Sequence, residues 1–244
     1  MPVITNAGTV TNVRNISLRA KKSVYNRKDF SWYEDDFDHF PREEIDGIRH
    51  YVTPNGSYPS VTTVLGKMLD KSGLDDWRAR VGDEEADRVS RLAATRGTNI
   101  HNMCENYVRG EDVDVSMPFN EYMFNQIKNV LDEHVDDIVG CELTLVSDEL
   151  KIAGSCDLIA LYDGKLSIID YKTSSKNKMK GWIESYFLQT VLYSYMLWEM
   201  TGMMAKQCVI IIAVEEESEA QVFIVKPREY LEKAAALCRA YHHQ

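Results

Sequence analysis

The apolar and polar residues along the 244-residue chain predict a helical first half followed by strands. Before residue 139 apolar residues recur at helical spacing, and afterwards short apolar runs are bounded by turn residues. The predicted helices cover 74–82, 83–109, 118–134, 182–200 and the residues from 228, and the predicted strands cover 139–146, 150–162, 165–172, 207–215 and 220–226. Two groups of strands joined by one crossover helix are typical of a mixed-sheet α/β domain, here with a helical N-terminal part.

The residues before the first long helix form three kinds of segment. Residues 1–30 show no pattern, and the acidic residues 33–44 predict a surface loop or a short helix. Residues 49–65 predict a short hairpin that turns at Pro-Asn-Gly, with Ser60 at the start of a helix. We therefore expect an arm with an acidic surface segment over 1–48 and one folded domain over 49–244.

The stretch GSCDLIALYDGKLSIIDYKTSSK, residues 154–176, contains the strongest turn signal. An Asp-Gly pair at 163–164 lies between two apolar runs, and this pair favours a tight hairpin because the turn needs positive φ. Such a turn pairs Tyr162 with Lys165.

Two carboxylates and a lysine share one face at the far end of this hairpin. Counting outward from the turn places Asp157 opposite Asp170, and Lys172 follows two residues later on the same face. Carboxylates about 5 Å apart repel by roughly 3 kcal/mol at an effective dielectric of about 20. This repulsion would destabilise a hairpin whose role is only structural. A divalent cation reverses the sign, and Mg²⁺ typically binds one or two carboxylates together with water and phosphate. The alternative is a solvated hairpin end, since Asp-x-Lys is common by chance.

The composition, 44% hydrophobic and 27% charged, is that of a soluble globular protein. No apolar run is long enough to span a membrane, and the first residues lack the basic-then-apolar order of a signal peptide. We therefore expect a cytoplasmic protein with no membrane partner. The five cysteines include no C-x-x-C spacing, so they predict reduced core thiols and neither a zinc site nor a disulfide framework.

The net charge of −10 argues against non-specific coating of nucleic acid but allows a local basic groove. Basic residues concentrate at 14–28 and 172–180. The first cluster is either a solvated tail or an arm that holds a DNA backbone. The second emerges from the hairpin, where Trp182 and Tyr186 are available for base stacking. Three of its lysines are expected to follow a nucleic-acid backbone: Lys176, Lys178 and Lys180.

Two predicted helices each carry a polar pair at i and i+4. In RGTNIHNMCENY, which begins at Arg96, the residues His101 and Glu105 lie on one face. Gln189 and Tyr193 have the same spacing on the helix 182–200. Each pair alone is more typical of a helix surface than of a ligand site.

Taken in order, the motifs RG-x-x-x-H-x-x-x-E, G-x-x-D, D-x-K-T and Q-x-x-x-Y resemble the RecB-like branch of the PD-(D/E)XK nuclease superfamily. Within that branch the chain is most similar to phage exonucleases and the mitochondrial genome maintenance exonucleases. The resemblance covers about residues 49–226 and implies a restriction-endonuclease-like mixed β-sheet flanked by helices. The roles that it implies are a metal-facing His101, metal-binding Asp157 and Asp170, a catalytic Lys172, Gln189 and Tyr193 beside the scissile strand, and Arg96 and Thr173 against nucleic acid.

The chain departs from the family pattern at its cysteines. Cys156 stands where the superfamily name has a proline, a common variation. Some relatives hold an iron–sulfur cluster through closely spaced C-terminal cysteines, whereas Cys208 and Cys238 are thirty residues apart. We therefore expect no iron–sulfur cluster.

Glu142 is the candidate for a further acid that completes the site. Its face depends on the register of the preceding hairpin. If Val146 pairs with Leu150, Glu142 faces away from Asp157; if the pairing shifts by one residue to Ser147, it faces the same way. A bulge at Gly154 would also change its face.

The expected activity is hydrolysis of DNA from a free end, preferentially single-stranded, with one or two Mg²⁺ or Mn²⁺ ions. We expect a phage-encoded enzyme that works in the host cytoplasm in replication, recombination or repair, with replication or recombination proteins as candidate partners. The alternatives are a structure-specific or flap endonuclease on the same fold and an inert nucleic-acid-binding module. Intact Asp157, Asp170 and Lys172 favour an active enzyme.

Overall fold

The structure is a computed structural model that describes residues 3–4, 10–11, 28–33, 37 and 39–244. The proposed N-terminal arm lies mostly outside the described residues, as do five of its basic side chains: Arg14, Arg19, Lys21, Lys22 and Arg27. In the described part of the chain, no helix is long and apolar enough to cross a membrane.

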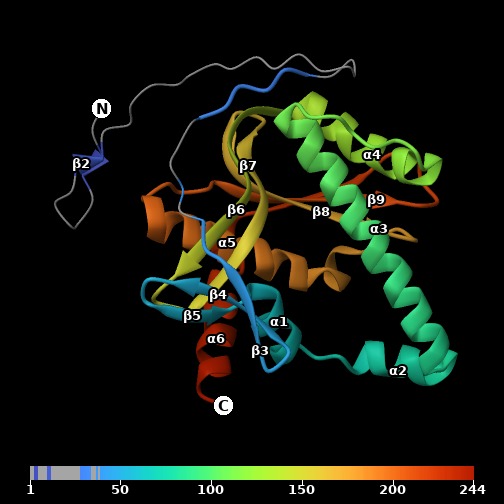
Figure 1. The fold of residues 1–244 in the computed structure, drawn as a ribbon, viewed down its shortest axis with the longest axis horizontal. Coiled ribbons are helices and arrows are strands. Elements are labelled where there is room, and N and C mark those ends of the chain that lie inside the picture. The colour runs from blue at the N-terminus through green and yellow to red at the C-terminus, as the bar shows by residue number, and fades with distance from the viewer. Residues whose placement is uncertain (1–2, 5–9, 12–27, 34–36, 38) are drawn as a thin grey trace.

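A five-stranded mixed sheet crosses the centre of the molecule (Figure 1). Its strand order is β10-β9-β8-β7-β6, in which β8 and β9 are parallel and the other neighbours antiparallel. The strands are β6 (Val135–Ser147), β7 (Ile152–Tyr162), β8 (Lys165–Ser174), β9 (Gln207–Val214) and β10 (Gln221–Val225). The expected mixed-sheet α/β fold is therefore confirmed.

Helices cover both faces of this sheet and enclose two cores. Helices α3 and α4 pack on one face, where Leu158 and Ile169 lie, and α1, α5 and α6 pack on the other, where Ile159 and Ile168 lie. The helices are α1 (Val61–Met68), α2 (Ser72–Val81), α3 (Asp83–Arg109), α4 (Pro118–His134), α5 (Glu184–Thr201) and α6 (Leu231–His242), with 3₁₀ turns at Lys180–Trp182 and Pro227–Glu229. The predicted bounds of the two long helices before the sheet, 83–109 and 118–134, agree with the structure.

The hairpin β7–β8 has the predicted register. Tyr162 pairs with Lys165, and the pairing continues to Leu158 with Ile169. Asp163 and Gly164 have φ values of 48° and 69°, the positive pair that a two-residue hairpin turn requires. The ends of β7 and β8 that bear the acids are thus fixed by a turn inside the hairpin itself.

The hairpin β6–β7 follows neither of the two predicted registers. Ser147 pairs with Ile152, and the same register runs through Leu145 with Gly154 to Leu143 with Cys156. No register shift falls at Gly154, because the shifts in this pair of strands lie between Val135 and Gly140.

A second, three-stranded sheet consists of β3 (Arg42–Ile45), β4 (Ile48–Thr53) and β5 (Gly56–Pro59). The predicted β4–β5 hairpin is confirmed, and Ser60 accepts a hydrogen bond from the Thr63 amide as the N-cap of α1. The prediction of a loop or short helix over 33–44 is wrong at its end, because residues 42–44 belong to β3. This strand is exposed at every position, so it lacks the apolar alternation that identifies a strand from sequence.

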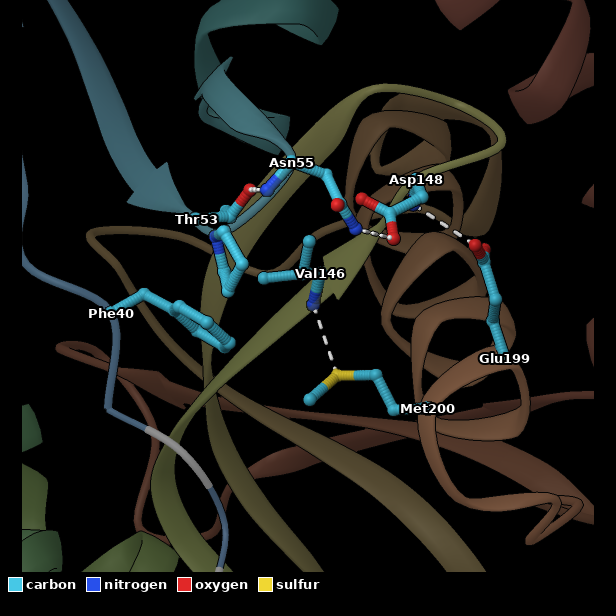
Figure 2. Close-up of a pocket in the computed structure, with 8 residues that line it drawn as sticks. Phe40, Thr53, Asn55, Val146, Asp148, Glu199 and Met200 are labelled. Atoms are coloured by element: carbon cyan, nitrogen blue, oxygen red, sulfur yellow. Dashed lines mark hydrogen bonds between the residues drawn. The ribbon is translucent and has the colours of Figure 1, made fainter. Parts of the chain in front are cut away.

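The small sheet is anchored to the main sheet and to α5. The Asn55 amide donates to Asp148 at 2.7 Å, and the Asp148 backbone amide donates to Glu199 of α5 at 2.9 Å. These residues border a cavity of about 200 Å³, in which the Val146 amide also contacts the Met200 sulfur (Figure 2). Ser60 forms a bridge to Ala153 of β7. The side chains of the small sheet are therefore held in a fixed place beside β7.

The described residues before β3 also contact the domain. Phe30 is buried in the core beneath α3 and α4, and Trp32 bridges to Ile138. Lys28, the last residue of the basic cluster 14–28, donates to the Asp132 carbonyl at 3.2 Å and pairs with Asp136 at 3.0 Å. The Lys28 ammonium thus lies at the C-terminal end of α4, where a cation interacts favourably with the helix dipole. The boundary at residue 48 stays a prediction.

Candidate functional site

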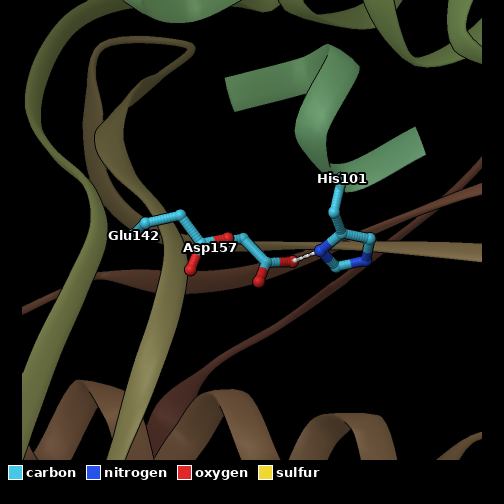
Figure 3. A group of neighbouring side chains, drawn as sticks. All are labelled: His101, Glu142 and Asp157. Atoms are coloured by element: carbon cyan, nitrogen blue, oxygen red, sulfur yellow. Dashed lines mark ion pairs between the residues drawn. The ribbon is translucent and has the colours of Figure 1, made fainter. Parts of the chain in front are cut away.

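Three side chains from three elements meet at the edge of the main sheet. Asp157 comes from β7, Glu142 from β6 and His101 from α3 (Figure 3). One ligand atom from each lies within 4.8 Å of the other two, and His101 Nδ1 is 3.4 Å from Asp157 Oδ2. Imidazole and carboxylate groups at such separations are a donor set for a divalent metal.

Glu142 reaches this group through an unusual backbone conformation. Its φ is +53°, in the left-handed region that residues other than glycine rarely adopt. Its neighbours on either side pair with Cys156 and Leu158, so Glu142 stands opposite Asp157. The Ser155 hydroxyl donates to Glu142 Oε2 at 2.6 Å and fixes the carboxylate. The structure thus places Glu142 on the side of Asp157, by a register that differs from both predicted ones.

Asp170 and Lys172 form a contact of their own next to this group. Asp170 is 1% exposed, and the Lys172 ammonium pairs with its Oδ2. Apart from this ion pair, neither Asp170 oxygen has a hydrogen-bond partner among the described residues. Lys172 also lies 5.2 Å from the centre of the Tyr186 ring. Tyr171 lies between Asp170 and Lys172 in the chain, and its backbone amide donates to Asp157 Oδ2 at 2.8 Å. The Asp157 carboxylate is therefore held by the backbone next to Asp170.

The charges in this region shift one another's protonation. Burial and the Asp157 charge raise the pKa of Glu142. Burial alone would raise the pKa of Asp157, but the His101 cation outweighs it and the net shift is downward. Burial raises the pKa of Asp170 to about 6, although the Lys172 cation opposes this.

The two bases show the complementary shifts. Burial acts to lower the pKa of His101, but the Asp157 carboxylate raises it to about 9. Burial likewise acts to lower the pKa of Lys172, and Asp170 with Asp157 raises it above the ordinary value. At neutral pH the site without metal therefore holds two cations, His101 and Lys172, beside carboxylates whose pKa values are shifted in opposite directions. A divalent ion bound here would compete with the His101 proton.

Glu142 and Asp157 line a cavity of about 600 Å³. Successive turns of α3 face this cavity through Gly97, His101 and Glu105. Gln189 and Tyr193 line it from α5, and the Gln189 amide donates to the Tyr193 hydroxyl at 3.2 Å. The structure thus brings the two predicted helix pairs to one cavity, although Glu105 is engaged by Arg109 at 2.9 Å.

Gly154 makes room for Tyr193. A Cβ at residue 154 would lie 2.8 Å from Tyr193 Cε1 and 3.2 Å from its hydroxyl oxygen. The Tyr193 ring is 3% exposed and lies in the core beneath α5. The glycine of the G-x-x-D motif is therefore required by the close approach of this ring, not by a bulge.

The predicted nucleic-acid-binding residues fall into two groups. Arg96 is engaged within the protein, because its guanidinium pairs with Glu215 and its Nε lies 3.5 Å from the Thr173 hydroxyl. The other group comprises three lysines that follow β8, and within the described residues none of their ammonium groups pairs with a carboxylate: Lys176, Lys178 and Lys180. Trp182, next to them, is 70% exposed.

Several residues at this site carry no signal of their own in the sequence. Ser155, which orients Glu142, and two arginines of the small sheet, Arg42 and Arg49, line the cavity. Ser155 adjoins the motif but has no signal of its own, since serine is common in strands. Arg42 lies in the acidic segment 33–44, which predicted a loop or a short helix, and Arg49 is the first residue of the predicted hairpin 49–65.

The residues at the site fit a bound divalent metal. Asp170 is a buried carboxylate with one partner, the Lys172 ammonium, and its two oxygens accept no other hydrogen bond from the described residues, so a second cation would stabilise it further. The residues that could hold the ion are the three clustered groups His101, Glu142 and Asp157, and beside them Asp170. Of the predicted ligand set, Asp170 is the one whose atoms fall outside the tight cluster.

Comparison with known proteins places this site in a family. A sequence profile of the PD-(D/E)XK nuclease superfamily matches residues 73–242, and the chain belongs to that superfamily. Human mitochondrial genome maintenance exonuclease 1 is 28% identical over 149 residues, which are 55% of this chain and 42% of that protein. The chain therefore spans less than half the length of this relative.

A solved protein from Eubacterium rectale, assigned as an exonuclease, is structurally similar with a TM-score of 0.40 and 15% identity. The superposition covers 62% of this chain and 68% of that one.

Proposed function

We propose that the chain is a metal-dependent DNA exonuclease that hydrolyses phosphodiester bonds from a free end, with a preference for single strands. The observation that carries this proposal is the convergence of His101, Glu142 and Asp157 on one cavity, beside the buried pair of Asp170 and Lys172. Membership of a nuclease superfamily and similarity to a human exonuclease support it.

In this proposal Mg²⁺ or Mn²⁺ would be held by Asp157 and Asp170, with His101 and Glu142 beside them. When bound, such an ion supplies Lewis-acid stabilisation of the phosphate oxygens and a more acidic water. Hydrogen bonds would orient two of these carboxylates: the Tyr171 amide donates to Asp157, and the Ser155 hydroxyl donates to Glu142. Lys172, held by Asp170, presents a cation to the charge that develops on the phosphate.

The path of the nucleic acid follows from the exposed groups. The ammonium groups of Lys176, Lys178 and Lys180 would contact the backbone, and the exposed Trp182 would stack on a base. Gln189 and Tyr193 would lie beside the scissile strand. Thr173 and Arg96 would contact the strand only if the Arg96–Glu215 pair opens. The nuclease domain would extend over residues 49–244, and replication or recombination proteins are the proposed partners.

The test is cleavage of an end-labelled single-stranded oligonucleotide in Mg²⁺, Mn²⁺ or EDTA. Asp170→Ala and Lys172→Ala should each abolish cleavage while thermal unfolding remains cooperative, and EDTA should abolish cleavage by the wild type. Lys165→Ala is the matched control, because Lys165 is exposed at the opposite end of the same strand. Wild-type turnover in either folded site variant would refute the assignment.

A further inference from the structure

The cavity that contains the acids has a second wall, which is basic. Arg42 of β3 and Arg49 of β4 line the same cavity as His101, Glu142 and Asp157. They come from the small sheet, far from the acids in sequence, and Figure 1 shows this sheet beside the ends of β6 and β7. One cavity thus has metal-binding chemistry on one side and two guanidinium groups on the other.

Neither arginine is neutralised within the described part of the chain. Among residues 28–33, 37 and 39–244, no carboxylate lies within ion-pair distance of Arg42 or Arg49, whereas the guanidinium groups of Arg78, Arg96 and Arg109 all have acidic partners. Both side chains are exposed, and Arg42 lies over the Tyr51 ring at 5.5 Å from its centre. An arginine stacked on a buried ring keeps its donors available in a fixed plane.

The register of the small sheet puts the two arginines on one face. Arg42 pairs with Tyr51, and Arg49, which pairs with Glu44 but forms no ion pair with it, precedes Tyr51 by two residues on the same strand, so the two arginines are diagonal neighbours on that face. The bridge of Ser60 to β7 and the Asn55–Asp148 hydrogen bond hold this face against the main sheet. Such a pair of forked donors suits a phosphate group bound in two-pronged geometry.

We propose that Arg42 and Arg49 form a second phosphate site, which binds a backbone phosphate of the substrate strand adjacent to the scissile one. This inference rests on the proposed function, since it takes a nucleic-acid strand as the ligand. The acids hold one phosphodiester through the metal, and the arginine wall holds a neighbouring phosphodiester of the same strand across the cavity. The small sheet then positions the end of the nucleic-acid strand relative to Lys172.

The experiment is equilibrium binding of a fluorescent oligo(dT) to the whole chain at several salt concentrations. Binding is measured in the Lys172→Ala background to prevent turnover, and cleavage is measured separately in the wild-type background. Arg42→Gln and Arg49→Gln should each weaken binding about tenfold, as expected for loss of a charged hydrogen bond. Each should also reduce the slope of log K against log salt by about 0.7, the value for one single-strand phosphate contact.

Arg228→Gln is the matched control, because Arg228 is exposed and does not line the cavity. It should leave affinity and salt slope unchanged. Should Gln disturb the small sheet, Arg42→Lys and Arg49→Lys keep the charge and should retain the salt slope while affinity falls less.

The outcomes separate the two proposals. Unchanged affinity and slope in both Gln variants would overturn the arginine site, as would a Lys172→Ala parent that does not bind the oligonucleotide. Binding that depends on the arginines without any cleavage by the wild type would instead refute the nuclease function and leave the phosphate site established.

Discussion

Replacing Gly154 by alanine should disturb the site from behind, through the Tyr193 ring. The new Cβ would lie 2.8 Å from Tyr193 Cε1, whereas ordinary contact begins at 3.4 Å. The ring must therefore retreat by about 0.6 Å, and it is fully packed against the core beneath α5. Overpacking of this kind costs about 1–3 kcal/mol.

The assay is denaturant unfolding of wild type and variant, followed by cleavage of a single-stranded oligonucleotide. We expect Gly154→Ala to lower the unfolding free energy by about 1–3 kcal/mol and to reduce turnover, because the Tyr193 hydroxyl that accepts from Gln189 at 3.2 Å moves with the ring. Gly66→Ala is the control. Gly66 is exposed in α1 with no atom within 4 Å of a new Cβ, so alanine there should stabilise by about 0.5–1 kcal/mol.

A double variant checks that the ring is the cause. Gly154→Ala with Tyr193→Leu removes the clashing ring, so the two losses of stability should not add. Additive losses, or a Gly154→Ala variant as stable as the wild type, would refute the explanation by close approach.

Three further predictions concern the site and the arm. In EDTA the unfolding free energy should fall by at most about 3 kcal/mol between pH 6.5 and 9, because the pKa of His101 is raised from 6.5 to about 9 and its pairing with Asp157 is lost as the imidazole deprotonates. Urea unfolding of His101→Ala should show a flatter dependence of the unfolding free energy on pH over this range. Ser155→Ala should weaken Mn²⁺ binding by roughly 10- to 100-fold in calorimetry, since it frees the Glu142 carboxylate, and an unchanged affinity would remove Glu142 from the ligand set. Deletion of residues 1–27 should flatten the salt dependence of DNA binding if the basic arm holds the backbone, and an unchanged slope would make it a solvated tail.

Local signals explain why much of the fold could be predicted from the sequence. The bounds of α3 and α4 follow from long helical periodicity, and the β7–β8 register follows from a two-residue turn within the hairpin. Because that turn fixes the pairing, the register as far as Leu158 with Ile169, which are the residues next to Asp157 and Asp170, follows by simple counting.

The position of Glu142 could not be predicted in this way. The turn between β6 and β7 includes Lys151 at φ 51°, so the first pair forms at Ser147 and Ile152, beyond both registers that strand alternation suggested. Glu142 also has a left-handed backbone, and its carboxylate accepts a hydrogen bond from Ser155 on the neighbouring strand, two features that no local propensity reports.

The arginine wall was hidden for a different reason. β3 is a short edge strand with Arg42, Glu43 and Glu44 exposed, and charged residues on an edge strand conceal it from apolar patterning. Likewise, the partner of Arg96 is Glu215, 119 residues away in the chain, so its engagement could be seen only in three dimensions.

The most direct test of the proposed exonuclease compares one single-stranded DNA in two forms, closed circular and linearised, incubated with the protein in Mg²⁺. We predict progressive degradation of the linear form, persistence of the circle, and no loss of either form with EDTA or with Lys172→Ala. Opening of the circle at a rate comparable to loss of the linear DNA would contradict the requirement for a free end and favour the endonuclease alternative, and binding without cleavage of either form would favour the inert module.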